Sequence, residues 1–228
     1  MAQVISTLNE KALHAALKAW YAQPGDQVEA PVDGYIIDLV RGGELVEIQV
    51  AGCSGLGRKL AALADQHPVR LVVPIAEQKW IVRADGDGRP LSRRKSPKRG
   101  AYEHIFRELV SFPRLLAHPH FQIEVLLIHE EEVREHSTMR AWRRKGWVTR
   151  ERRLIQVVGR KMLESPQDAA ALLPAALPAA FTTADLAQAL GQPRWLAQKM
   201  AYCLREMGML LATGKRGNAV VYERAPLA

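Results

Sequence analysis

Residues 34–50, GYIIDLVRGGELVEIQV, have the pattern of two short strands joined at Gly42 and Gly43. Side chains alternate along a strand, so a two-residue turn pairs Asp38 with Glu47 and sets Gln49 on the same face. A three-residue bulged turn would instead put the two acids on opposite faces. Opposed carboxylates repel each other, and aliphatic neighbours raise that cost. The hairpin therefore predicts a stabilising partner for Asp38 and Glu47.

A divalent cation is the partner that the residue types favour. Mg²⁺ takes oxygen ligands, often one or two carboxylates with waters, and opposed side chains about 5 Å apart at Cβ can converge on one ion. We therefore expect Mg²⁺ or Mn²⁺, held by Asp38 and Glu47. The alternative is a solvated hairpin whose acids align by chance. The same alternation predicts one apolar face, formed by Tyr35, Ile37, Leu39, Val46, Ile48 and Val50.

The elements around the hairpin indicate an α/β domain. A first helix is predicted over residues 8–22, where Thr7 and Glu10 have the spacing of a capping box. A second helix follows the hairpin at 58–66, and apolar runs at 69–76 and 79–85 predict two further strands. This order of elements suggests a mixed sheet with helices packed against it.

This arrangement resembles the PD-(D/E)XK nuclease superfamily. The resemblance covers residues 8–83, and its motif is Asp38, eight intervening residues, and then Glu47-Ile48-Gln49. It implies an α/β, restriction-endonuclease-like mixed sheet flanked by helices. It also implies that the Asp and the Glu hold a metal ion that positions water and stabilises charge on the scissile phosphate.

The chain departs from the family pattern at Gln49, where the family usually has lysine. A glutamine can hydrogen-bond a water molecule but supplies no positive charge. Some restriction enzymes of the superfamily use Glu-x-Gln, and other members carry the basic residue on the next helix, where Lys59 lies in this sequence. Lys59 is equally well explained as a solvated helix residue. Glu10 resembles the first-helix acid of some nucleases, although the capping box also explains it.

Positive charge is concentrated in the middle of the chain. The formal net charge is +8 and the pI is near 9.7, and residues 77–160 alone carry a net +8. We expect an exposed basic loop at 85–100 and a basic segment at 139–153 that contact phosphates, although a solvated basic face is the simpler alternative. The candidate contacts are Arg93, Arg94, Lys95, Lys98, Arg99, Arg143, Arg144 and Lys145.

The C-terminal segment predicts a winged helix-turn-helix. Two helices are expected at 182–191 and 193–208, followed by a hairpin with a basic tip at 209–224. Helical spacing puts Leu196, Met200, Cys203, Leu204 and Met207 on one side of the second helix. A polar stripe of Arg194, Gln198, Tyr202 and Arg205 is left free, and Lys215 and Arg216 lie in the wing. A protein-binding module is the alternative to DNA binding.

Three parts of the chain follow from these patterns. Residues 1–160 form the nuclease-like domain, 161–180 a linker or first helix, and 181–228 the winged-helix domain. The two cysteines are far apart, so no disulfide framework is predicted and a reducing cytoplasm is the simplest setting. No membrane partner is indicated. The acidic run at 129–136 lacks the spacing of a zinc helix and is predicted to lie on the surface.

The leading functional hypothesis is a Mg²⁺-dependent DNA endonuclease or nuclease-like DNA-processing protein. Asp38 and Glu47 are its expected ligands, Gln49 orients water, and Lys59 and Glu10 assist. A non-catalytic DNA-binding regulator with the same fold is the alternative. RNA as the substrate stays open, as does the homodimer that is common among restriction enzymes.

Overall fold

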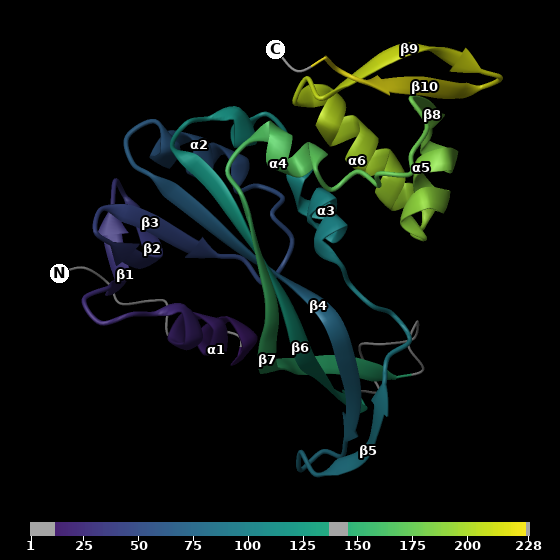
Figure 1. The fold of residues 1–228 in the computed structure, drawn as a ribbon. Coiled ribbons are helices and arrows are strands. Elements are labelled where there is room, and N and C mark those ends of the chain that lie inside the picture. Colours follow the sequence, from purple (N-terminus) through teal and green to yellow (C-terminus); the bar gives the residue numbers. More distant parts are fainter. Residues whose placement is uncertain (1–11, 137–145, 227–228) are drawn as a thin grey trace.

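A seven-stranded mixed sheet forms the larger part of the protein in the computed structural model, which describes residues 12–136 and 146–226 (Figure 1). The strand order is β1-β2-β3-β4-β6-β7, and β5 pairs with β4. The β3–β4 and β4–β6 pairs are parallel, and the other pairs are antiparallel. The strands are β1 (Gln27–Val32), β2 (Tyr35–Arg41), β3 (Glu44–Ile48), β4 (Val69–Ala84), β5 (Pro90–Lys95), β6 (Phe121–His136) and β7 (Trp147–Leu163).

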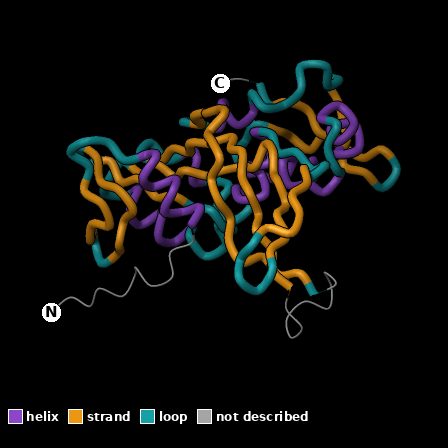
Figure 2. The backbone as a smooth tube through the Cα atoms, turned by 90° about the horizontal axis from the view of Figure 1, so that it is seen from below, coloured by secondary structure: helices purple, strands orange, loops and turns teal. Residues whose placement is uncertain are grey.

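Helices cover both faces of this sheet, as the sequence predicted. Helix α1 (Ala12–Tyr21) buries Leu13 and Leu17 against one face, in a cluster with Leu39, Val46 and Ile48. Helix α2 (Gly57–Ala64) buries Leu60 and Leu63 against the other face. In the view from below, helices lie between and beside the strands along the molecule (Figure 2). The expected mixed sheet flanked by helices is therefore confirmed.

The strands are longer and more numerous than the sequence indicated. The runs at 69–76 and 79–85 are one continuous strand, β4, and residues 27–32 add strand β1. The prediction of a loop throughout 85–100 is wrong, because part of this segment is strand β5, which pairs with the C-terminal half of β4. Residues 101–117 form three short helical segments, η2 (Tyr102–Ile105), α3 (Phe106–Leu109) and η3 (Leu115–Ala117). The C-terminal halves of β4 and β6 and the N-terminal half of β7 project beyond the helices as an arm (Figure 1).

The C-terminal segment forms two helices and a three-stranded sheet in the order β8-β10-β9. Helix α5 starts after Thr182, whose hydroxyl accepts hydrogen bonds from the N–H groups of Ala184 and Asp185, and it ends at Gly191 in a left-handed conformation (φ 61°). The elements are α4 (Pro166–Ala170), β8 (Ala180–Thr182), α5 (Thr183–Leu190), α6 (Arg194–Glu206), β9 (Leu210–Arg216) and β10 (Ala219–Arg224).

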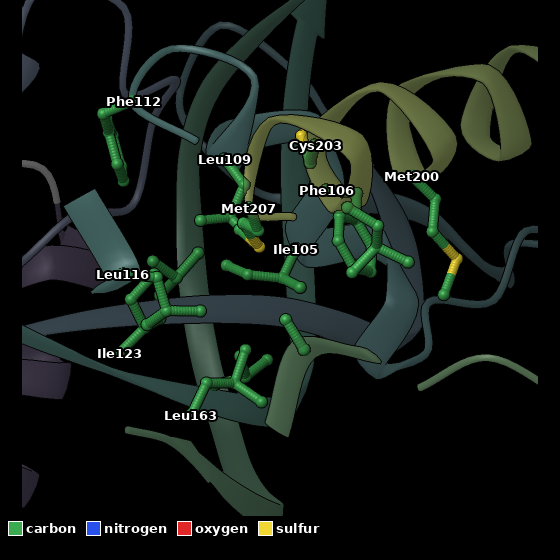
Figure 3. Close-up of a cluster of buried hydrophobic side chains, with 14 of the residues drawn as sticks. Ile105, Phe106, Leu109, Phe112, Leu116, Ile123, Leu163, Met200, Cys203 and Met207 are labelled. Carbon is green, nitrogen blue, oxygen red and sulfur yellow. The ribbon is translucent and has the colours of Figure 1, made fainter. Parts of the chain in front are cut away.

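One hydrophobic cluster joins the large sheet to the C-terminal segment. It contains Leu45 and Leu71 of the sheet, Phe106 of α3, and Met200 and Cys203 of α6, all buried. Ten of its members are labelled in Figure 3. The division into domains at residues 160 and 181 stays a prediction, and residues from both sides of it share this core.

Candidate functional site

The β2–β3 hairpin has the two-residue turn that the sequence predicted, and the predicted register holds for the three pairs next to that turn. Gly42 (φ 56°) and Gly43 (φ 90°) both adopt positive φ, as a tight two-residue turn requires. The paired residues are Leu39 with Val46, Val40 with Leu45, and Arg41 with Glu44. The predicted pair of Asp38 and Glu47 is not among these main-chain pairs, although the negative charge of Asp38 is near enough to raise the pKa of Glu47.

The regular ladder ends at Asp38, because the carboxylate of this residue replaces a main-chain acceptor. The N–H of Ile48 donates to Oδ2 of Asp38 at 2.8 Å. Ile37 packs in the cluster on the α2 side, whereas Leu39 packs on the α1 side. Tyr35 also packs on the α2 side, so the predicted single face containing Tyr35, Ile37 and Leu39 is wrong.

The neighbouring strand is irregular at the same level. The β1–β2 pairs are Val28 with Leu39 and Ala30 with Ile37, so Glu29 and Asp38 are left out of the ladder. Glu29 has a positive φ of 52°, which is a strained conformation for a residue with a side chain. Its carboxylate accepts a 2.6 Å hydrogen bond from Nζ of Lys18 on α1. The strained backbone of Glu29 therefore lies beside Asp38, where the β2–β3 ladder ends.

Each of the two acids uses one oxygen for a protein contact. Oδ2 of Asp38 lies 3.2 Å from Nε2 of His14 on α1 and also accepts from Ile48, while Oδ1 accepts no hydrogen bond from the described residues. Oε1 of Glu47 accepts from Nζ of Lys59 at 2.7 Å. Oε2 of Glu47 is buried and has no hydrogen-bond partner within the described ranges. The pair thus has one unmatched oxygen on each carboxylate.

The electrostatics of Glu47 reflect this arrangement. Burial raises the pKa of Glu47 above its usual range, the ion pair with Lys59 opposes that change, and the negative charge of Asp38 adds to it. Because the net direction is upward, the charged form of Glu47 is under-compensated by the surrounding protein.

Lys59 is the basic residue that the structure brings to the acids. It lies in the first turn of α2, with only 18% of its side chain exposed, and its Nζ is 5.8 Å from the centre of the Tyr35 ring. Of the two interpretations of Lys59, the solvated helix residue is therefore wrong.

Gln49 turns toward the following loop. Its side-chain Nε2 donates to the carbonyl of Gly52 at 3.0 Å, and its main-chain N–H donates to Val72. The role of Gln49 in orienting water stays a prediction. Glu10 lies outside the described residues, as do Arg143, Arg144 and Lys145.

His14 is the site residue that the sequence reasoning missed. It follows Glu10 by four residues, which is the spacing of side chains on one face of a helix. Extending the helical face from Glu10 would have indicated His14 as a neighbour of the acids. In the described ranges, no group of three or more His, Cys, Asp or Glu side chains has the arrangement of a metal site.

The basic residues of β5 are exposed, and several contact other groups. Arg93 lies over the ring of Trp80 and pairs with Glu131 at 2.7 Å, and Lys95 lies over the same ring. Arg99 pairs with Glu77. The side chains of Arg94 and Lys98 are exposed and have no ion-pair partner among the described residues. Among the described residues, two of these five cations are therefore ion-paired, and Arg94, Lys95 and Lys98 are not.

The stripe on α6 is exposed, as predicted. Arg194, Gln198, Tyr202 and Arg205 are all solvent-exposed, whereas Leu196, Met200, Cys203, Leu204 and Met207 are buried. Arg205 pairs with Glu206 on the same helix. Lys215 and Arg216 are exposed at the tip of the β9–β10 hairpin, and Arg216 lies 3.4 Å from Asp185.

Replacing Lys59 with methionine is expected to lower the free energy of unfolding by about 1–3 kcal/mol at pH 7, because a buried carboxylate loses its cation. The loss should be small below the ordinary glutamate pKa of 4.5, where protonated Glu47 needs no cation, and should grow as pH rises. Urea unfolding at several pH values measures it. The matched control is Arg58→Met, an exposed neighbour on α2. Equal losses for both variants would contradict the prediction.

The fold and the site together define a mixed α/β protein with two partly buried carboxylates, Asp38 and Glu47, where the β2–β3 ladder ends, and among the described residues Oε2 of Glu47 has no hydrogen-bond partner. A family model described as "Domain of unknown function (DUF8091)" matches residues 11–164. A Treponema pallidum (strain Nichols) protein described as "Uncharacterized protein" is 31% identical over 223 residues, which are 97% of this chain and 88% of that protein. The chain belongs to the DUF8091 family. No solved structure matches it.

The comparisons extend past the predicted nuclease-like part. The similarity to the Treponema protein covers nearly the whole chain, whereas the family model ends at residue 164.

None of the helices in the described ranges combines the length and the apolar character needed to cross a bilayer.

Proposed function

We propose that this protein is a metal-dependent endonuclease of the PD-(D/E)XK type that acts on DNA. The observation that carries the proposal is the buried Oε2 of Glu47, which has no hydrogen-bond partner among the described residues and belongs to the carboxylate expected opposite Asp38. A carboxylate oxygen without a donor is costly in a folded protein. A function that uses this oxygen explains why it is kept.

The donor set fits a hard divalent cation. Asp38 and Glu47 each have one oxygen that accepts no hydrogen bond in the described part of the chain, and carboxylate oxygens are the ligands that Mg²⁺ prefers. A bound ion would neutralise the two acids, polarise water and stabilise negative charge on a phosphodiester. His14 and the N–H of Ile48 hold the Asp38 carboxylate in place from its other oxygen.

Lys59 supplies the positive charge that Gln49 lacks. Its ammonium group lies 2.7 Å from Oε1 of Glu47, so it is positioned to stabilise a developing negative charge beside the acids. Gln49 would need to release Gly52 to orient a water molecule. We therefore assign the larger role to Lys59.

Duplex recognition is assigned to α6 and the β9–β10 hairpin. The order α4, β8, α5, α6, β9, β10, with a sheet order of β8-β10-β9, is the one expected of a winged helix-turn-helix. The exposed stripe from Arg194 to Arg205 is suited to base edges in the major groove, and Lys215 and Arg216 to phosphates. Arg94 and Lys98 would add backbone contacts.

Mn²⁺ calorimetry on the wild type and on Asp38→Asn tests the proposal. We expect the wild type to bind Mn²⁺ and the variant to lose that binding, since the amide removes one of two ligand charges. The same preparations are incubated with Mg²⁺ and end-labelled duplex DNA or RNA. The proposal would be wrong if the wild type binds no metal and cuts neither nucleic acid.

A second function, a DNA-binding regulator without catalysis, is favoured by one observation. Lys59 already partly compensates Glu47, so the fold tolerates the acids without an ion. Duplex binding by a wild type that shows no Mn²⁺ site would support this function instead.

A further inference from the structure

Helix α3 lies between the large sheet and α6. The five-residue α4 also contacts α6, so both short helices cover it. Phe106 and Leu109 of α3 are fully buried in the cluster that also contains Met200 and Cys203 of α6 (Figure 3). The C-terminal helices therefore complete their core with residues from the sheet-bearing part.

Polar contacts join the same two parts. Arg114 pairs with Glu206 at 2.8 Å, at the C-terminal end of α6. At its other end, Gln192 donates to Glu103 at 3.2 Å. Contacts at both ends of a helix, with a buried face between them, oppose both sliding and rotation. The exposed stripe of α6 is thus fixed in orientation relative to the sheet.

Residues 106–111, which contain α3 and are called the α3 segment, also contact the backbone that follows the acids. Oε2 of Glu108 accepts a 2.9 Å hydrogen bond from the N–H of Cys53, in the loop whose Gly52 carbonyl accepts from Gln49. At the start of α2, a Cβ on Gly57 would lie 3.4 Å from the carbonyl oxygen of Ser111, so this backbone approaches α2 closely just before Lys59. One short segment therefore contacts α6, the Gln49 loop and the helix that carries Lys59.

We infer that α3 is a rigid brace that fixes the distance between the DNA-facing stripe of α6 and the acid pair. This inference rests on the proposed function. It specifies the pattern of cutting: a duplex read by α6 would be cut at one constant offset from the recognised bases.

An iron–EDTA chelate attached through Ser54→Cys measures that offset without relying on the protein's own catalysis. Ser54 is exposed in the loop that follows Glu47 and Gln49. Burial raises the pKa values of Cys53 and Cys203 to about 12, which protects both native thiols from labelling. The probe is a random duplex DNA pool enriched by binding to the wild-type protein. Radical scission without Mg²⁺ maps the bases nearest the acids, and Mg²⁺-dependent cuts by unlabelled protein are mapped on the same pool.

We expect radical scission confined to one window at a constant offset from the enriched bases, with Mg²⁺-dependent cuts inside it. A constant window without Mg²⁺-dependent cuts supports the brace and contradicts the nuclease. Mg²⁺-dependent cuts at scattered offsets, or scattered radical scission, overturn the brace while leaving any observed cutting intact. Failure to enrich any duplex overturns the brace, because no bases are then read at a fixed offset, and the nuclease proposal is then decided by its own Mn²⁺-binding and cleavage tests. Leu109→Ala, carried in parallel with the exposed Leu91→Ala, should lose the single offset only in the first variant.

Discussion

Under the proposed nuclease function, replacing Glu47 with glutamine is expected to lower Mg²⁺-dependent cleavage by about 10³-fold, since several kcal/mol of charge stabilisation would depend on a metal that this carboxylate would help to hold. The same variant should be more stable than the wild type at pH 7. Burial raises the pKa of Glu47 even with Lys59 beside it, so the charged form costs free energy in the folded state. Glutamine removes that charge and keeps an oxygen for Lys59.

The stability difference between Glu47→Gln and the wild type should depend on pH. A glutamate whose pKa is raised by folding contributes most to stability below its ordinary pKa of 4.5, where it is protonated in both states. That contribution is lost as pH rises through the folded-state pKa. The gain of Glu47→Gln over wild type should therefore be absent at pH 4 and present at pH 7, as measured by urea unfolding.

The matched control is Asp87→Asn, which removes an exposed carboxylate with no side-chain partner in the described ranges. It should change neither cleavage nor the pH dependence. A Glu47→Gln variant that cuts as fast as the wild type would remove Glu47 from the site. A variant that loses stability at pH 7 would show that the ion pair with Lys59 outweighs burial. An activity loss joined to a stability gain is the expected signature of a functional carboxylate.

Local chemistry made the hairpin and the C-terminal elements predictable. Gly42 and Gly43 allow the positive φ values of a two-residue turn, which fixes the register of the strands on either side. Thr182 and Gly191 mark the two ends of α5 in the same local way. The buried and exposed sides of α6 followed from helical spacing alone.

The opening of the sheet at Asp38 was not predictable from alternation. Alternation assumes that every strand residue completes a main-chain ladder, and here a side-chain oxygen takes the hydrogen bond of Ile48. Helical spacing from Glu10 indicates His14 as a candidate neighbour, but its contact with Asp38 depends on how α1 packs across the sheet. The position of Glu108 against Cys53 is likewise set by tertiary packing.

The acidic run on β6 shows the same limit. Residues 129–136 were predicted to lie on the surface, but Glu130 and Glu132 are buried. Their partners come from other strands: Arg152 of β7 pairs with Glu130, and Lys79 of β4 with Glu132. Burial opposes ionisation of Glu132, but hydrogen bonds from Lys79 and other donors outweigh it and lower its pKa to about 2. Charge compensation between distant segments is not visible in a single run of residues.

Replacing Phe106 with alanine is expected to lower the free energy of unfolding by about 3–5 kcal/mol, the usual cost of removing a buried aromatic side chain from a packed core. Phe106 is fully buried in the cluster that joins the sheet to α6 (Figure 3). Urea unfolding measures the loss. The control, Leu91→Ala, removes a side chain that is 63% exposed and should cost less than about 0.5 kcal/mol.

Hydrogen exchange measures whether Phe106→Ala destabilises only one of the two parts of the chain, the large sheet or the C-terminal helices, or both. If α3 completes the core of the C-terminal helices, amides of β6 and of α6 should lose protection together in Phe106→Ala, because both elements pack in the same cluster. Two independently folded parts would behave differently: protection would fall in only one of them. Shared loss would mean that the C-terminal helices depend on the sheet for their own stability. The orientation of the α6 stripe relative to Glu47 would then be set by this shared core.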